Sequence, residues 1–271
     1  MVLGFLLTSL LAACSPVQFS AKSTDPVTPT DPSGIDDPRC TPGTVEEIRR
    51  LTKLLFVVDT SGSNVGTTSW MGSIIPATDP EKHFRFGALM DFLVRYRHKT
   101  NFEWGLITFS GNHAQAYIHW DSPKRPAFAG ADVMANALHL FYLEPDGGMT
   151  PYGAALELAR VAIENDPDRQ SNKNPQYFVI LISDGFPTDY FDHRDRFNDH
   201  ALAADIDALL NVAPNQIRLS TIFYGQVLIP EAIHLLQGIA YRGGGHFATV
   251  RNLQSGFRID DVIPGQTEPC Q

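Results

Sequence analysis

This sequence of 271 residues is short of basic side chains, of cysteine and of long apolar runs. Its 21 Lys and Arg stand against 30 Asp and Glu, a formal net charge of −9, and they form no basic stripe. Proteins that bind nucleic acid cluster Lys and Arg to neutralise phosphates, so we exclude a nucleic-acid partner. The N-terminal apolar run, residues 1–13, is shorter than the roughly 20 residues that cross a bilayer, and it predicts no transmembrane helix.

The same N-terminal run carries features of an export signal. Residues 1–13 are uncharged, mostly apolar and end in small residues, as in a secretory signal peptide, although no Lys or Arg precedes the run. The quartet Leu11–Cys14 resembles the bacterial lipobox, in which the cysteine is acylated and becomes the first residue after cleavage. We therefore expect a lipid on Cys14 and an anchor in the cell envelope; the alternative is an ordinary signal peptide with an incidental cysteine. Ser15, in place of Asp, favours the outer membrane.

Two further cysteines complete the set, Cys40 and Cys270. Exported proteins occupy oxidising compartments, where paired cysteines persist. Because Cys14 is used for the lipid, these two cysteines are the only partners left for an intramolecular disulfide. We expect them to be bridged, which would tie the two ends of the folded domain together; two free thiols are the alternative.

The segment between the lipobox and the domain has almost nothing to bury. Residues 15–39 are rich in Pro, Ser, Thr and Asp, and such a segment cannot offset its ordering entropy, so it predicts a disordered tether. The remaining length suits one domain better than two. The predicted organisation is a lipoprotein signal peptide over 1–13, the lipidated cysteine and tether over 14–45, and one domain over 46–271.

After the tether, strand-like and helix-like segments alternate. Continuous apolar runs such as Leu54–Val58 predict strands buried on both faces, whereas the residues after Thr78–Glu81 combine cap chemistry with helical spacing. The predicted strands are 54–58, 102–110, 114–120, 177–182, 219–224 and 246–250, and the predicted helices are 78–96, 131–143, 151–165, 201–210 and 230–241. This alternation predicts an α/β fold with a doubly wound, mostly parallel six-stranded sheet and helices on both of its faces.

Oxygen-bearing side chains occupy three loops on the face where ligands bind in doubly wound folds, beyond the carboxyl ends of the strands. Asp59–Ser63 follows the first apolar strand, Ser183–Gly185 follows a second, and Gly147–Pro151 opens a helix. Each loop alone is ordinary turn or cap chemistry. Together they supply two carboxylates and three hydroxyls, without thiolate or imidazole, which is the hard oxygen set that Mg²⁺ prefers.

These residues closely resemble the metal-ion-dependent adhesion site of von Willebrand factor A domains, a family that includes the integrin I-domains. The family pattern is Asp-x-Ser-x-Ser, then a distant Thr and a distant Asp, and it is matched here by Asp59, Ser61, Ser63, Thr150 and Asp184. The resemblance covers about residues 51–259. It implies that Mg²⁺, or else Mn²⁺ or Ca²⁺, contacts the three hydroxyls directly and the two carboxylates mostly through water or hydrogen bonds. It also implies that an Asp or Glu carboxylate of a protein partner completes the coordination.

Two long loops should lie on the same face. Residues 64–82 form an insertion whose apolar content either shapes ligand choice or covers the site, or else packs on the flank of the domain. Residues 186–200 are read as a solvated loop in which Asn198 or Asp199 caps the next helix, in preference to a second metal site. We place four residues at the rim where a ligand would bind: Trp70, Tyr152, Phe186 and Asp189.

The sequence favours a binding module over an enzyme. It has no Gly-x-Ser-x-Gly nucleophile motif and no histidine placed as the base of one. A phosphotransferase of the haloacid dehalogenase type would need Asp at the position of Ser61. We therefore expect a cell-surface lipoprotein that binds a protein ligand, in adhesion or another protein interaction. The alternative is a structural protein of envelope assembly with an internal metal site; a metal-dependent hydrolase or phosphotransferase is disfavoured.

Overall fold

The computed structural model describes residues 50–68, 74–171, 173–191, 196–225, 229–250 and 258–263, with backbone alone at 67–68 and 74–75. The predictions for Cys14, Cys40, Cys270, Trp70 and the tether lie outside these residues. No helix among the described residues is long and apolar enough to cross a membrane.

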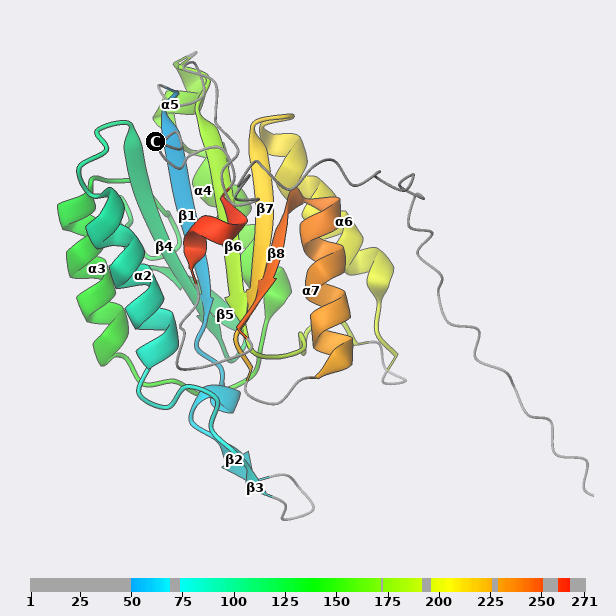
Figure 1. Cartoon of the computed structure of the whole chain (residues 1–271). Coiled ribbons are helices and arrows are strands. Elements are labelled where there is room, and N and C mark those ends of the chain that lie inside the picture. Colours follow the sequence, from blue (N-terminus) through cyan, green and yellow to red (C-terminus); the bar gives the residue numbers. More distant parts are fainter. Residues whose placement is uncertain are drawn as a thin grey trace, which may run out of the picture. The chain divides into compact units, whose positions relative to one another are not determined.

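A six-stranded sheet forms the centre of the domain, in the order β5-β4-β1-β6-β7-β8 (Figure 1). All neighbouring pairs are parallel except β4 and β5, which are antiparallel. The strands are β1 (Thr52–Asp59), β4 (Phe102–Ser110), β5 (His113–Ala116), β6 (Gln176–Ser183), β7 (Ile217–Phe223) and β8 (Gly244–Thr249). Because the order runs outward from β1 in both directions, the carboxyl ends of β1, β4 and β6 meet where ligands bind in doubly wound sheets.

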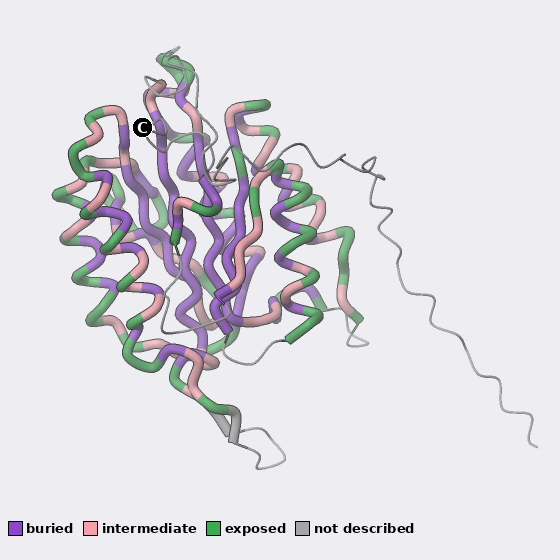
Figure 2. The backbone as a smooth tube through the Cα atoms, in the orientation of Figure 1, coloured by how far each residue is buried: buried purple, intermediate pink, exposed green. Residues whose placement is uncertain are grey.

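Helices cover both faces of this sheet, as predicted. Alternate residues of β1 enter two different cores: Leu55 and Val57 pack with α4, α6 and α7, and Phe56 packs with α2 and α3. The sheet is largely buried between these layers, and the exposed positions gather on the helices and loops (Figure 2). The helices are α2 (His83–Tyr96), α3 (Ala131–Leu143), α4 (Tyr152–Glu164), α5 (Pro167–Gln170), α6 (Asp199–Val212) and α7 (Pro230–Arg242), with 3-10 turns η1 (Gly62–Asn64) and η2 (Ile259–Val262).

The prediction that the first helix starts at Thr78 is wrong. Helix α2 begins at His83, after Lys82, which has a left-handed backbone with φ of 57°. Asp79 nevertheless caps the helix from a distance, because its carboxylate accepts from the backbone N–H groups of Phe84 at 3.1 Å and Arg85 at 3.2 Å. Of the two residues that the sequence offered as caps, Thr78 and Asp79, only Asp79 binds amides of the first turn, and the N-cap position itself is Lys82.

The other helices and strands lie closer to their predicted bounds. The strand predicted over 114–120 is confined to β5, and its predicted continuation survives only as an isolated bridge between His119 and Pro126. The helix predicted over 131–143 coincides with α3, and Asn198 caps α6 by accepting from Ala201 N–H at 3.1 Å. Within the insertion, β2 (Thr67–Thr68) and β3 (Ile74–Ile75) pair as an antiparallel hairpin.

Candidate metal-binding site

The predicted metal residues lie in loops that extend from neighbouring parallel strands. Asp59 is the last residue of β1, and Asp184 directly follows β6, whose register pairs Val58 with Ile182. Parallel strands end at the same edge of a sheet, so this register brings the two acidic residues together. Between them, the Ser183 hydroxyl donates to Asp59 Oδ2 at 2.6 Å. Ser183 stands in the predicted loop, but its bridging role was not anticipated.

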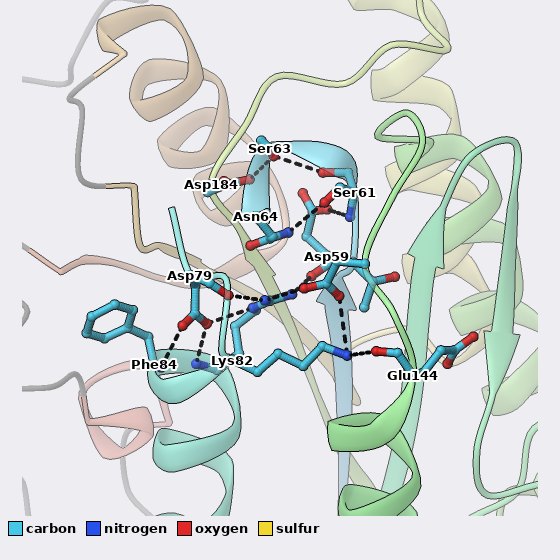
Figure 3. A network of polar contacts seen from close by, with 12 residues as sticks. Asp59, Ser61, Ser63, Asn64, Asp79, Lys82, Phe84, Glu144 and Asp184 are labelled. Atoms are coloured by element: carbon cyan, nitrogen blue, oxygen red, sulfur yellow. Dashed lines mark hydrogen bonds and ion pairs between the residues drawn. The ribbon is translucent and has the colours of Figure 1, made fainter. Parts of the chain in front are cut away.

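The two serines of the first loop connect one carboxylate to the other. Asp59 Oδ1 accepts from the backbone N–H of Ser61 at 2.7 Å, and the hydroxyls of Ser61 and Ser63 lie 3.0 Å apart. Ser63 Oγ donates to Asp184 Oδ1 at 2.8 Å, so these two side chains point toward each other (Figure 3). The sequence spacing Asp-x-Ser-x-Ser thus directs its side chains into one polar cluster.

Thr150 reaches the same cluster because its loop is hydrogen-bonded to the first one. The N–H of Gly62 donates to the carbonyl of Gly148 at 2.9 Å, and the N–H of Gly147 donates to the carbonyl of Thr60 at 2.8 Å. Gly148 has φ of +81°, and a Cβ there would stand 2.8 Å from the backbone of Gly111, so only glycine permits this approach. The buried Thr150 places its hydroxyl 3.9 Å from the position of a Cβ on Gly185, beside Asp184.

Thr150 does not cap α4, although a Thr before a Pro at the start of a helix is ordinary N-cap chemistry. The N-cap of α4 is Pro151, and no side chain at that position makes a cap hydrogen bond. The role falls to Asp189, which accepts from the N–H of Tyr152 at 3.1 Å and of Gly153 at 2.8 Å. The Thr150 hydroxyl is therefore not committed to the start of its own helix.

The predicted rim is only partly at the surface. Tyr152 is fully buried, and its hydroxyl donates to the carbonyl of Gly185 at 3.0 Å, so its placement at the rim is wrong. Phe186 is half-buried against Phe197, with ring centroids 4.8 Å apart. Asp189 is exposed but serves as the α4 cap, so its loop is more structured than the solvated reading assumed. Trp70 lies outside the described residues.

Burial disfavours the ionised forms of both carboxylates. Both are buried, with 0% of Asp59 and 3% of Asp184 exposed. Desolvation, followed by the nearby Asp184 charge, raises the pKa of Asp59 to about 7, and burial also raises the pKa of Asp184. Asp184 Oδ2 is buried without a hydrogen-bond partner among the described residues. A buried carboxylate oxygen of this kind is costly unless a cation satisfies it.

Positive charge lies beneath the cluster, which the sequence did not reveal. The guanidinium of Arg85 is fully buried and donates to the backbone carbonyl of Asp59 at 2.7 Å. It also pairs with Asp79 at 2.9 Å and with Asp146 at 2.7 Å. Lys82 lies 3.4 Å from the other oxygen of Asp146. No periodicity or motif marks these residues, because their contacts join segments far apart in the chain.

The oxygens that could hold a metal ion are those of the five predicted residues. Within the described residues, no group of three or more His, Cys, Asp and Glu side chains gathers as a metal site. The cluster instead combines two carboxylates with the hydroxyls of Ser61, Ser63 and Thr150. Such a set suits a hard divalent cation and offers nothing to a soft one.

Comparisons with known proteins bear on the fold. No family model matches the sequence, and no curated protein is similar to it. Two forms of the pilus adhesin SpaC from Lactobacillus rhamnosus GG match 76% of this chain with TM-scores of 0.50 and 0.51, at 12% and 13% identity. This chain spans 28% and 29% of those adhesin chains.

Two further solved structures have lower scores. A von Willebrand factor type A protein from Catenulispora acidiphila matches 75% of this chain and 39% of its own, at 14% identity with a TM-score of 0.47. The manganese-loaded TRAP protein of Plasmodium vivax matches 70% and 64%, at 18% identity with a TM-score of 0.45. The sheet order, with parallel strands and one antiparallel edge, together with the likeness to the SpaC structures, shows that this chain has a doubly wound fold of the von Willebrand factor A type.

Proposed function

We propose that this chain is a protein-binding module that captures a carboxylate of its partner through a divalent cation, Mg²⁺ in the first place. Asp59, Ser61, Ser63, Thr150 and Asp184 would hold the ion. The observation that carries the proposal is the convergence of these side chains on one edge of the sheet, with a buried Asp184 oxygen that lacks a hydrogen-bond partner in the described part of the chain.

The buried charge at this edge fits a divalent cation. Four carboxylates are buried here, those of Asp59, Asp79, Asp146 and Asp184. Two buried basic side chains, Lys82 and Arg85, face them, so the negative charges are in excess when all four carboxylates are ionised. Buried charges need compensation, and a divalent cation bound here would favour the ionised forms of Asp59 and Asp184.

The chemistry follows from the type of donor. The cation would supply a strong electrophile at the surface of the domain. The serine and threonine hydroxyls are neutral, and Asp59 and Asp184 already accept hydrogen bonds from Ser183 and Ser63. The ion would therefore be held directly by neutral oxygens, and a partner carboxylate that approaches it would gain a charge-assisted interaction. This arrangement binds and positions an acidic group, and we assign no reaction to it.

Thr150→Ala tests the proposal at the residue that is least involved in the fold. We expect the variant to bind its partner at least tenfold more weakly, which corresponds to about 1.4 kcal/mol, because one direct oxygen donor is lost. Thr150→Ser, which keeps the hydroxyl, is the matched control and should bind nearly as well as the wild type. Isothermal titration of the full chain with Mg²⁺, and then with candidate partner proteins with and without EDTA, gives both affinities. Partner binding that survives EDTA and Thr150→Ala alike would place the working surface elsewhere.

We also propose that the chain is a lipoprotein of the cell envelope, most simply of the outer membrane. The support is the Leu11–Cys14 quartet at the end of an apolar run, followed by the Pro-rich segment 15–39. The bridge between Cys40 and Cys270 is part of the same proposal, since export places both thiols in an oxidising compartment. Such an anchor and tether would present the metal face to a partner at some distance from the bilayer.

Cys14→Ser tests the anchor. The sulfur that carries the lipid is lost, so we expect the variant to leave the detergent phase on phase separation, or to persist as an uncleaved precursor. Fractionation and intact mass spectrometry measure both effects, with Cys40→Ser as the control that retains the anchor. If Cys14→Ser changes neither the fractionation nor the mass of the mature chain, the lipoprotein proposal is wrong.

A further inference from the structure

The buried guanidinium of Arg85 contacts three separate segments that surround the candidate metal site. Its Nε donates to Asp79 Oδ2 at 2.9 Å, and one terminal nitrogen donates to the carbonyl of Asp59 at 2.7 Å. The other terminal nitrogen donates to Asp146 Oδ2 at 2.7 Å and to the carbonyl of Asp79 at 2.9 Å. Burying a guanidinium is costly unless its donors are satisfied, so this set of contacts strongly restrains the segments that supply them.

The three residues that accept hydrogen bonds from Arg85 belong to three different segments around the site. Asp59 ends β1 and begins the first metal loop, whereas Asp146 stands four residues before Thr150 in the loop that leads to α4. Asp79 ends the segment that returns from the inserted hairpin of β2 and β3. A single side chain of α2 therefore connects both metal loops with the insertion.

The returning segment of the insertion also lies along the first metal loop. The N–H of Thr78 donates to the carbonyl of Ser63 at 3.1 Å, and the N–H of Asp79 donates to the carbonyl of Asn64 at 3.1 Å. The Thr78 side chain lies close enough to Asp184 to favour the ionised form of its carboxyl group, which lowers the pKa. The insertion therefore contacts the first metal loop through its backbone. Its Thr78 side chain lies beside Asp184, and its Asp79 side chain pairs with Arg85.

Lys82 holds Asp146 from the other side. Its ammonium donates to the carbonyl of Glu144 (Figure 3). It also donates to the carbonyl of Phe141 at 2.7 Å and lies 3.4 Å from Asp146 Oδ1. The two carbonyls belong to the end of α3, where they have no helical partner. Asp146 is therefore fixed between two cations, and with it the start of the loop that carries Thr150.

We propose that Arg85, together with Asp79 and Asp146, is the positioning element of the metal site and mechanically couples the inserted hairpin to it. This inference rests on the proposed metal-dependent function. Arg85 would not touch the ion itself: it fixes the backbone of Asp59 and, through Asp146, the start of the loop that carries Thr150, so that the two loops are held together.

Arg85→Lys is the first test, measured as Mg²⁺ affinity by isothermal titration and as melting temperature in EDTA, on the full chain. Lysine keeps the charge but has a single nitrogen, which cannot reach Asp59, Asp79 and Asp146 together. We expect at least a tenfold loss of Mg²⁺ affinity. Asp146→Asn, which keeps the shape and an acceptor oxygen, should lower the affinity in the same direction and serves if Arg85→Lys does not fold.

Lys53→Arg is the matched control. Lys53 is a buried cation on the same strand as Asp59, paired with Asp168 at 2.6 Å and Asp166 at 3.3 Å. It stands six residues before Asp59, which is about 20 Å along a strand. Exchanging this cation should lower the melting temperature and leave the Mg²⁺ affinity within twofold of the wild type.

The outcomes separate the two proposals. If the wild type does not bind Mg²⁺, the proposed function fails. If the wild type binds Mg²⁺ but Arg85→Lys and Asp146→Asn bind it equally well, or if Lys53→Arg weakens it as much as they do, the positioning role is refuted. A loss of affinity confined to the Arg85 and Asp146 variants upholds it.

Discussion

Asp59→Asn is expected to abolish detectable Mg²⁺ binding and, at the same time, to raise the melting temperature of the metal-free protein at neutral pH. Asp59 is fully buried and lies close enough to Asp184 for the Asp184 charge to oppose its ionisation. Removing one charge relieves this repulsion and the cost of desolvation. The asparagine carbonyl can still accept from the N–H of Ser61, and its amide can donate to Ser183, so the hydrogen-bond geometry is retained.

The opposite signs of the two effects make this substitution informative. A residue that serves only the fold would lose stability on substitution, whereas a residue held in an unfavourable state for the sake of an ion gains stability. Differential scanning calorimetry in EDTA and isothermal titration with Mg²⁺ measure the two quantities. A lower melting temperature of Asp59→Asn in EDTA, or an unchanged Mg²⁺ affinity, would contradict the proposed role.

Asp166→Asn is the matched control for this experiment. Asp166 is likewise buried, but it accepts from the hydroxyl of Tyr177 at 2.7 Å and pairs with Lys53 at 3.3 Å. Its charge is compensated, so its loss should destabilise the domain, because the buried lysine loses a partner. Since Asp166 lies at the far end of the sheet from Asp59, the Mg²⁺ affinity should not change.

The sheet could be predicted because its strands are buried on both faces. Runs such as Leu54–Val58 and Tyr177–Ile182 have no polar interruption, and both became central strands. Residues 131–143 gave their helix without error, because helical spacing and burial coincide there. The local sequence pattern was enough to predict a strand or a helix wherever burial alone determines that element. It was less reliable at the sheet edge, where β5 is shorter than its β-like sequence suggested.

The helix caps show which contacts a local sequence pattern cannot predict. A polar residue next to a helix predicts a cap, and this held for Asn198 on α6. For α4 the cap is Asp189, which accepts a hydrogen bond from the N–H of Tyr152, thirty-seven positions earlier in the chain. No sequence spacing predicts a cap at such a distance. The consequence is functional, because a distant cap leaves the Thr150 hydroxyl to the candidate metal site.

The candidate site shows the same division. Its five oxygen donors could be predicted, because each follows a strand or precedes a helix at the edge where doubly wound sheets bind ligands. The network beneath them could not. Arg85 reads in the sequence as one more polar position of an amphipathic helix, and only the fold reveals that it is fully buried against Asp59 and Asp146. Buried polar networks are specified by contacts between distant segments, which periodicity does not encode.

The last prediction concerns pH. In the metal-free protein the pKa of Asp59 is raised to about 7 from an ordinary value of 3.8, and the pKa of Asp184 is raised as well, both first of all by burial. The folded state therefore holds these protons more tightly than the unfolded state does. Stability is then greatest below the unfolded value and is lost as the pH rises toward 7. In EDTA we expect the melting temperature to fall by several degrees between pH 5.5 and pH 8.

Saturating Mg²⁺ should remove that fall, because the bound ion keeps both carboxylates ionised and the proton no longer distinguishes the folded from the unfolded state over this range. The shift produced by Mg²⁺ is therefore larger at pH 8 than at pH 5.5, and the apparent Mg²⁺ affinity should weaken by roughly tenfold per pH unit below 7, as one proton competes with the ion. Calorimetric scans at both values, in EDTA and in Mg²⁺, measure the effect, and Asp59→Asn should show a much smaller pH dependence without metal. A metal-free protein that melts at the same or a higher temperature at pH 8 would mean that folding does not raise the pKa values of the two carboxylates, and the charge argument for a divalent cation would lose its basis.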